Sequence, residues 1–171
     1  MSCVTLSGYT LDCNKTSGGV KKIYLVEFDD VTAYAKSAAG LVTSITLATS
    51  VVFKEYEIQR EDSDWGQTFT GSRENRTVAW EQLLRLKIHK NSTSIVAEVT
   101  ALAKLTGMAI VQNESGNYYL LGADSGLEMT NTTAYASGVL REDMNGYTIE
   151  MGGKEKLPAP MIDSTIIAGL L

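Results

Sequence analysis

The sequence predicts a mainly β fold with one flanking helix, and three observations lead to this prediction. Short β-branched and apolar runs recur along the chain, and each is bracketed by Gly, Asn, Asp or Ser. Two of these runs, residues 65–71 and 77–89, are joined by a short polar connection, which is typical of a long β-hairpin. Only residues 91–105 show the periodicity of an amphipathic helix.

Length and charge restrict the possible functions. The chain has 171 residues, which fits one domain over residues 1–171 with an N-terminal arm at 1–19 and a C-terminal arm at 152–171. Its 15 Lys and Arg against 20 Asp and Glu give a net charge of −5, which argues against a protein that grips nucleic-acid phosphates. No apolar run is long enough for a membrane helix, so we expect no membrane partner.

The first part of the chain predicts one firm strand and two weak ones. Residues 20–28 form an apolar, β-branched run between Gly19 and Asp29, and we expect a core strand there. Residues 29–50 are small and polar, which indicates a mobile loop with one weak strand at 41–47. Residues 51–60 approximate the period of a strand with charged, exposed flanks.

The predicted long hairpin has two different faces. Because side chains alternate along a strand, one face of its second strand collects mostly apolar residues and should be largely buried. These residues are Val78, Trp80, Gln82, Leu84, Leu86 and Ile88. The opposite face is mostly polar and should be wet.

The single helix is expected over about residues 91–106. Asn91 or Ser92 can cap its N-terminus, and Gly107 suits its C-terminal end. Its apolar stripe, which should pack against the sheet, consists of Ile95, Val99, Leu102 and Leu105.

The remainder of the chain predicts a tight hairpin, a long loop and a last strand. Residues 108–112 and 117–122 flank a turn at 113–116. Residues 123–146 are rich in small polar residues, and a loop of this length usually has a function. A last strand follows at 147–151. The C-terminal arm ends in apolar residues that would seek a partner surface, namely Ile166, Ile167, Leu170 and Leu171.

Residues that could carry catalysis or bind a metal are few, and we predict no enzyme, cofactor or metal site. The only histidine, His89, falls near the end of a strand, and zinc would need more Cys and His ligands than the chain supplies. Cys3 and Cys13 are expected to be reduced thiols, although they could pair if the N-terminus folds back. Clustered carboxylates at Asp29 and Asp30 and at Glu61, Asp62 and Asp64 are best interpreted as solvated loop charge.

Several hairpin residues have two possible interpretations. Arg73 and Arg76 either stay simply exposed or hold an acidic neighbour across an interface. Trp65 and Trp80 either stack on a ligand or pack in the core or at an interface, and we favour packing. We place Phe69 with these four residues in a candidate oligomer interface.

The order of these segments resembles structural proteins of tailed phages that infect gut Bacteroidota. The resemblance is carried by SGGVKKIYLVEFDD at 17–30, the long hairpin, the helix, the hairpin at 112–122, and the strings at 126–130 and 145–149. It is similar to the tail-tube superfamily, which implies a β-sandwich or half-barrel with one flanking helix. Members of that superfamily form rings that stack into a conduit for DNA.

The resemblance implies a virion protein of the phage tail, assembled in the host cytoplasm. It would form homo-oligomeric rings, most simply hexamers, that contact other tail or neck proteins. Phage DNA would pass without specific binding, along a lumen for which Glu61, Asp62 and Asp64 are the candidate acidic residues.

Three other functions remain open from sequence. The same β domain could serve as a head–tail connector or as a capsid decoration protein. It could instead be a β-sandwich ligand-binding module that uses Trp65, Trp80 or Tyr118 and Tyr119, or a small hydrolase that uses Asp29, Asp30 or His89.

Overall fold

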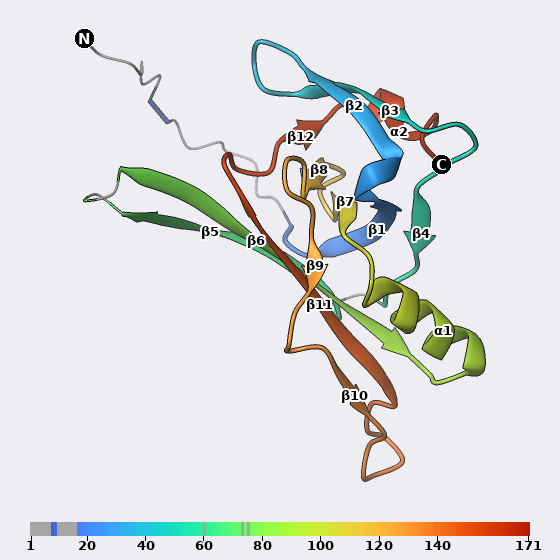
Figure 1. Cartoon of the computed structure of the whole chain (residues 1–171). Coiled ribbons are helices and arrows are strands. Elements are labelled where there is room, and N and C mark those ends of the chain that lie inside the picture. Colours follow the sequence, from blue (N-terminus) through green and yellow to red (C-terminus); the bar gives the residue numbers. More distant parts are fainter. Residues whose placement is uncertain (1–7, 10–16, 60, 73, 75) are drawn as a thin grey trace.

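The structure is a computed structural model that describes residues 8–9, 17–59, 61–72, 74 and 76–171. The predicted fold class is confirmed, since 48% of the described residues are in strands and 11% are helical. Two sheets pack face to face, and a helix flanks them (Figure 1). Cys3, Cys13 and most of the expected N-terminal arm lie outside the described residues.

The larger sheet, sheet A, contains seven of the described strands in the order β2-β3-β12-β8-β7-β1-β4. Their bounds are β1 Val20–Glu27, β2 Val31–Lys36, β3 Val42–Leu47, β4 Lys54–Tyr56, β7 Gly107–Asn113, β8 Tyr118–Leu121 and β12 Met161–Ile162. Strand β1 pairs antiparallel with β7, and β7 pairs with β8. The predicted first strand and the predicted tight hairpin are thereby confirmed.

The second sheet, sheet B, contains the predicted long hairpin. The strands described in it run β10-β11-β6-β5, and β9 also pairs with β11. Their bounds are β5 Asp64–Ser72, β6 Thr77–His89, β9 Glu128–Met129, β10 Ala134–Ala136 and β11 Gly146–Glu155. The last strand predicted at 147–151 is therefore present but longer.

Two apolar clusters form the core of the fold. The first lies between them, where Leu84 and Leu86 of β6 and Ile149 of β11 meet Ile23 and Leu25 of β1. Because alternate residues of β6 point to this core, Gln82, Leu84 and Leu86 are buried as the alternation predicts. The second cluster lies on the other face of sheet A, beneath β3 and α2 (Ser164–Ile167). Strands β1 and β7 are consequently buried on both faces.

The predicted helix is confirmed as α1, Thr93–Leu102, slightly shorter than expected. Its N-cap is Ser92, whose hydroxyl oxygen accepts a hydrogen bond from the backbone N–H of Ile95 at 3.3 Å. Leu102 is its only buried residue and belongs to the first apolar cluster, and Val99 packs against that cluster. No helix in the described part of the chain is long and apolar enough to span a membrane.

Two segments between the first strand and the hairpin differ from expectation. In residues 29–50 the predicted weak strand is present as β3, but the rest is not the mobile loop that was expected. It begins with the short 3-10 helix η1 (Phe28–Asp30) and contains β2, which pairs antiparallel with β3. Val42 and Ile45 anchor that pair in the second cluster, which stabilises a segment of otherwise small residues. Of the strand expected at 51–60, only Lys54–Tyr56 pairs with β1.

The C-terminal arm also differs from expectation. Ile167 and Leu170, which were expected to seek a partner surface, are each only 6% exposed and pack in the second apolar cluster of the same chain. Ile166 is half-buried against the same cluster, whereas Leu171 is exposed. The apolar end is used mainly within the chain because it covers the outer face of sheet A.

Candidate functional site: the projecting arm

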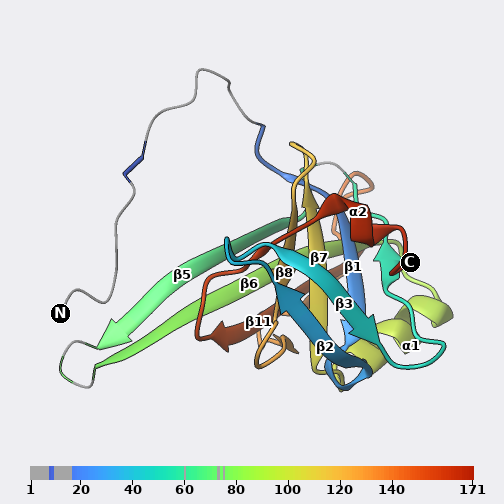
Figure 2. The same cartoon turned by 90° about the horizontal axis from the view of Figure 1, so that it is seen from above.

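The outer half of the β5–β6 hairpin projects from the sandwich as a two-stranded ribbon (Figure 2). Strand β11 accompanies β6 only as far as the pair Glu155 and Trp80. Residues 68–72 and 77–80, which lie around and beyond this point, form what we call the arm. A two-stranded hairpin alone in water is marginally stable, so the arm is a segment that gains from a partner.

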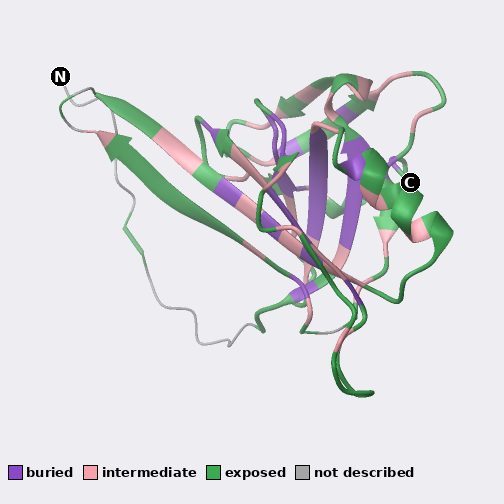
Figure 3. Cartoon of the chain, turned by 60° about the horizontal axis from the view of Figure 1, so that its bottom comes forward, coloured by how far each residue is buried: buried purple, intermediate pink, exposed green. Residues whose placement is uncertain are grey.

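One face of the arm is apolar and exposed. Phe69 and Trp80 are directly opposite each other, with ring centroids 5.5 Å apart in an edge-to-face arrangement. Val78, opposite Gly71, lies two pairs further out, and Phe69 and Val78 are 56% and 57% exposed. By the alternation of β6 this face continues the one that carries Leu84 and Leu86 in the core. The core-facing side of sheet B thus extends beyond the body, and Figure 3 shows the outer part of the hairpin coloured mainly as exposed.

This apolar face contains a groove of about 420 Å³ near the tip. Its lining residues are Phe69, Gly71, Ser72, Arg76, Thr77 and Val78. Gly71 shapes the groove, because a Cβ there would lie 2.9 Å from the phenyl ring of Phe69. The absence of a side chain therefore lets the ring lie against the strand.

The opposite face of the arm is polar. Thr68 is paired with Glu81, and Thr70 with Ala79, and all but the half-buried Ala79 are exposed. The arm is therefore amphipathic, although both of its faces include exposed residues and, among the residues that the structure describes, neither face lies in an apolar cluster. This arrangement differs from a solvated hairpin, in which both faces would be polar.

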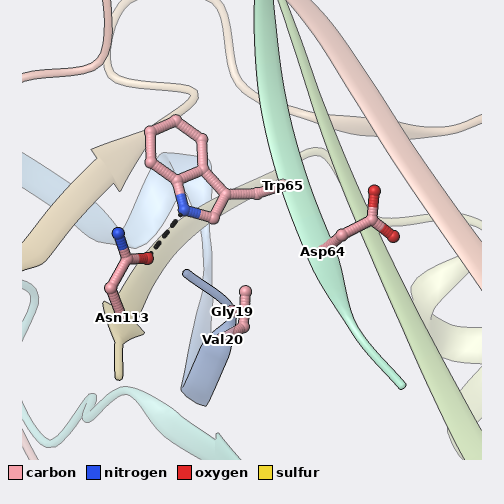
Figure 4. A pocket seen from close by; sticks show the side chains of 5 residues that line it. All are labelled: Gly19, Val20, Asp64, Trp65 and Asn113. Atoms are coloured by element: carbon pink, nitrogen blue, oxygen red, sulfur yellow. Dashed lines mark hydrogen bonds between the residues drawn. The ribbon is translucent and has the colours of Figure 1, made fainter. Parts of the chain in front are cut away.

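The base of the arm is fastened to sheet A. The indole Nε1 of Trp65 donates a hydrogen bond to Asn113 Oδ1 at 3.0 Å, beside a small pocket of about 220 Å³ (Figure 4). The Trp65 ring also packs against Tyr119, with centroids 4.8 Å apart. The backbone N–H of Ala159 donates to Gln67 Oε1 at 2.9 Å. Trp65 therefore has the packing role that the sequence favoured, and the arm leaves the body from a fixed base.

The outer face of sheet B carries ion pairs, and these include two of the three predicted lumen carboxylates. The carboxylate of Asp62 accepts hydrogen bonds from His89 Nε2 at 2.5 Å and from Lys87 Nζ at 3.2 Å. Both bonds lower the pKa of Asp62, and the bond from His89 has the larger effect. Asp64 pairs with Arg85 at 3.4 Å. Glu61 is exposed. The negative charge of Asp62 and Asp64 is therefore largely compensated within the chain.

The structure brings together only part of the predicted oligomer interface. Phe69, Trp80 and Arg76 lie on the arm, Trp65 lies at its base, and Leu171 lies elsewhere on the surface. Arg73 lies outside the described residues. Among the described residues, no group of three or more His, Cys, Asp or Glu side chains is arranged to hold a metal ion.

Sequence reasoning missed a second exposed apolar feature in the loop between β10 and β11. Val139 is 96% exposed and Leu140 is 61% exposed. Asp143 fixes the loop, because its Oδ2 accepts hydrogen bonds from the backbone N–H groups of both residues at 2.8 Å. The spacing of Gly138 and Asp143 around two apolar residues was the available signal, and it does not reveal exposure.

Comparison of the chain with protein-family models, with curated proteins and with solved structures finds no match.

Proposed function

We propose that this chain is a virion structural protein, a tail-tube-type subunit that assembles into homo-oligomeric rings. The observation that carries the proposal is the arm, a ribbon with an exposed apolar face that continues the core surface of sheet B. Such a surface favours association, since exposed contiguous apolar surface is reduced by contact with a partner, and we propose that the partner is a second copy.

The architecture supports this class of assembly. The sequence resembles a superfamily of ring proteins that have a β-sandwich with one flanking helix. The two sheets and one flanking helix of this chain are consistent with that architecture. Among the described strands β5 is the edge of sheet B, and an edge strand offers backbone groups to which another strand can add. A closed ring would cover the face and the edge of every copy at once.

The net charge is compatible with a DNA conduit. At −5 the chain repels phosphates on average, so DNA would slide without being held. The ion pairs on the outer face of sheet B reduce the free acidity there, so net charge contributes less to the proposal than the arm does.

The first test is negative-stain electron microscopy of the full chain, with light scattering on the size-exclusion peak. Rings or hollow tubes are expected. Phe69→Asp should abolish them, because a carboxylate would be buried in the contact. The matched control is Thr70→Asp, on the polar face of the same strand, which should still assemble. A chain that stays monomeric at high concentration would contradict the proposal.

A further inference from the structure

The loop between β10 and β11 presents a small apolar tip, defined by Val139 and Leu140. The two side chains are exposed, yet the backbone beneath them is fixed by Asp143. A rigid apolar tip loses little conformational entropy when it binds, which favours it as a docking element. The chain itself offers nothing that covers it within the described residues.

The tip and the arm groove lie at opposite ends of the same sheet. The groove is beside Thr77 and Val78, at the start of β6. The tip follows β10, next to the pair of Gly146 and His89 at the end of β6. Strand β6 has 13 residues and therefore spans roughly 40 Å. Figure 1 shows the arm and the loop extending in opposite directions. One chain therefore cannot bring its own tip to its own groove.

The two features match in chemistry. The groove of about 420 Å³ is bordered by aromatic and aliphatic side chains, and Arg76 lines it. The tip carries two aliphatic side chains followed by Arg141, Glu142 and Asp143. Arg76 and Glu142 have opposite charges and are both exposed, so they can pair when apolar groups meet.

We propose that the Val139 and Leu140 tip of one copy docks in the arm groove of a second copy, with Arg76 facing Glu142. This inference rests on the self-assembly in the proposed function and specifies its contact. The contact is heterologous, since two different surfaces meet. Repetition of such a contact gives a ring where the rotation closes and a filament where it does not.

The test is disulfide cross-linking between two cysteine variants of the full chain, both made with Cys3→Ser and Cys13→Ser. Val78→Cys places a thiol in the groove, and Leu140→Cys places one on the tip; both sites are exposed, so folding should be unaffected. After oxidation, a cross-linked dimer is expected in the mixture of the two variants and not in either alone. Thr70→Cys, on the polar face of the arm, mixed with Leu140→Cys is the control and should give none.

The other outcomes separate this inference from the proposed function. Dimers of Val78→Cys alone or of Leu140→Cys alone would show a symmetric contact and overturn the heterologous one. Rings without the mixed cross-link would overturn the docking and leave the function standing. A monomer without any cross-link would overturn both.

A charge reversal checks the ion pair separately. Arg76→Glu in the groove variant should reduce the yield of the mixed cross-link, and Glu142→Arg in the tip variant should restore it. Failure of the paired reversal to restore the yield would overturn the pairing of Arg76 with Glu142.

Discussion

Trp65 and Asn113 join the base of the arm to the end of β7 through a hydrogen bond of 3.0 Å from the indole nitrogen to the side-chain oxygen. Trp65 is the cross-strand partner of the core residue Leu84, and its ring rests on Tyr119. The direction in which the arm leaves the body is thus fixed by contacts inside the sandwich. A binding surface on the arm is positioned before any partner arrives.

Trp65→Phe should lower the free energy of unfolding by about 1 kcal/mol or more. The substitution removes a hydrogen bond worth roughly 0.5–1.5 kcal/mol and part of an aromatic contact. Urea denaturation followed by circular dichroism measures the change. The matched control is Trp80→Phe, outside both apolar clusters, which should alter stability by less than about 0.5 kcal/mol. Equal losses for the two variants would contradict the anchoring role of Trp65.

Glu150 should make the fold less stable in acid. Its carboxylate is buried and accepts hydrogen bonds from Thr132 and Arg85, which hold its pKa below the ordinary value of 4.5. Since the folded pKa is depressed, this stabilisation is present above pH 4.5 and is lost as the pH falls through the lower folded value. The urea concentration at the midpoint of unfolding should therefore decrease as the pH is lowered below 4.5.

Glu150→Gln should flatten that part of the pH profile, because it removes the titrating group. Glu81→Gln is the control, since Glu81 is exposed on the same sheet. An unchanged acid slope in Glu150→Gln would assign the acid sensitivity to other carboxylates.

Gly146 should be intolerant of any side chain. A Cβ at this position would lie 2.0 Å from the backbone oxygen of Ile88, and no rotamer relieves a clash with a neighbouring strand. Gly146→Ala should therefore destabilise by about 1–3 kcal/mol or more and separate β11 from β6. Gly66→Ala is the matched control: Gly66 is in a strand of the same sheet with open space around it, so the change should stay within about 0.5 kcal/mol. Thermal denaturation of both variants measures the difference.

The sequence predicts the fold well wherever local pattern and tertiary packing agree. The alternation along β6 predicts the burial of Leu84 and Leu86, and Ser92 caps α1 as its position before an apolar stripe indicates. Strand β3 is the weak strand expected at 41–47, but its neighbour β2 was missed because its residues are mostly small or polar. The pair is stabilised by distant partners that include Ile162. Single-strand periodicity contains no information about such partners.

The candidate site could be predicted only in part, for a similar reason. The sequence shows that Phe69 and Trp80 are apolar residues of one hairpin. How exposed they are depends on where β11 ends, which is decided by the tertiary structure. Ile167 and Leu170 show the converse, since an apolar C-terminus has the same sequence pattern whether it meets another copy or covers its own sheet. The exposed Val139 was missed because polar loop composition says nothing about which side chains protrude.

Replacement of residues 69–80 by Asn-Gly should leave the sandwich folded and abolish assembly. None of the described residues in this segment belongs to either apolar cluster, and a two-residue Asn-Gly turn suits a shortened hairpin. We expect a circular dichroism spectrum and a cooperative urea transition close to those of the full chain. Light scattering should show a monomer. Rings formed by the shortened chain would show that the arm is dispensable, and the assembly contact would then have to lie on another surface.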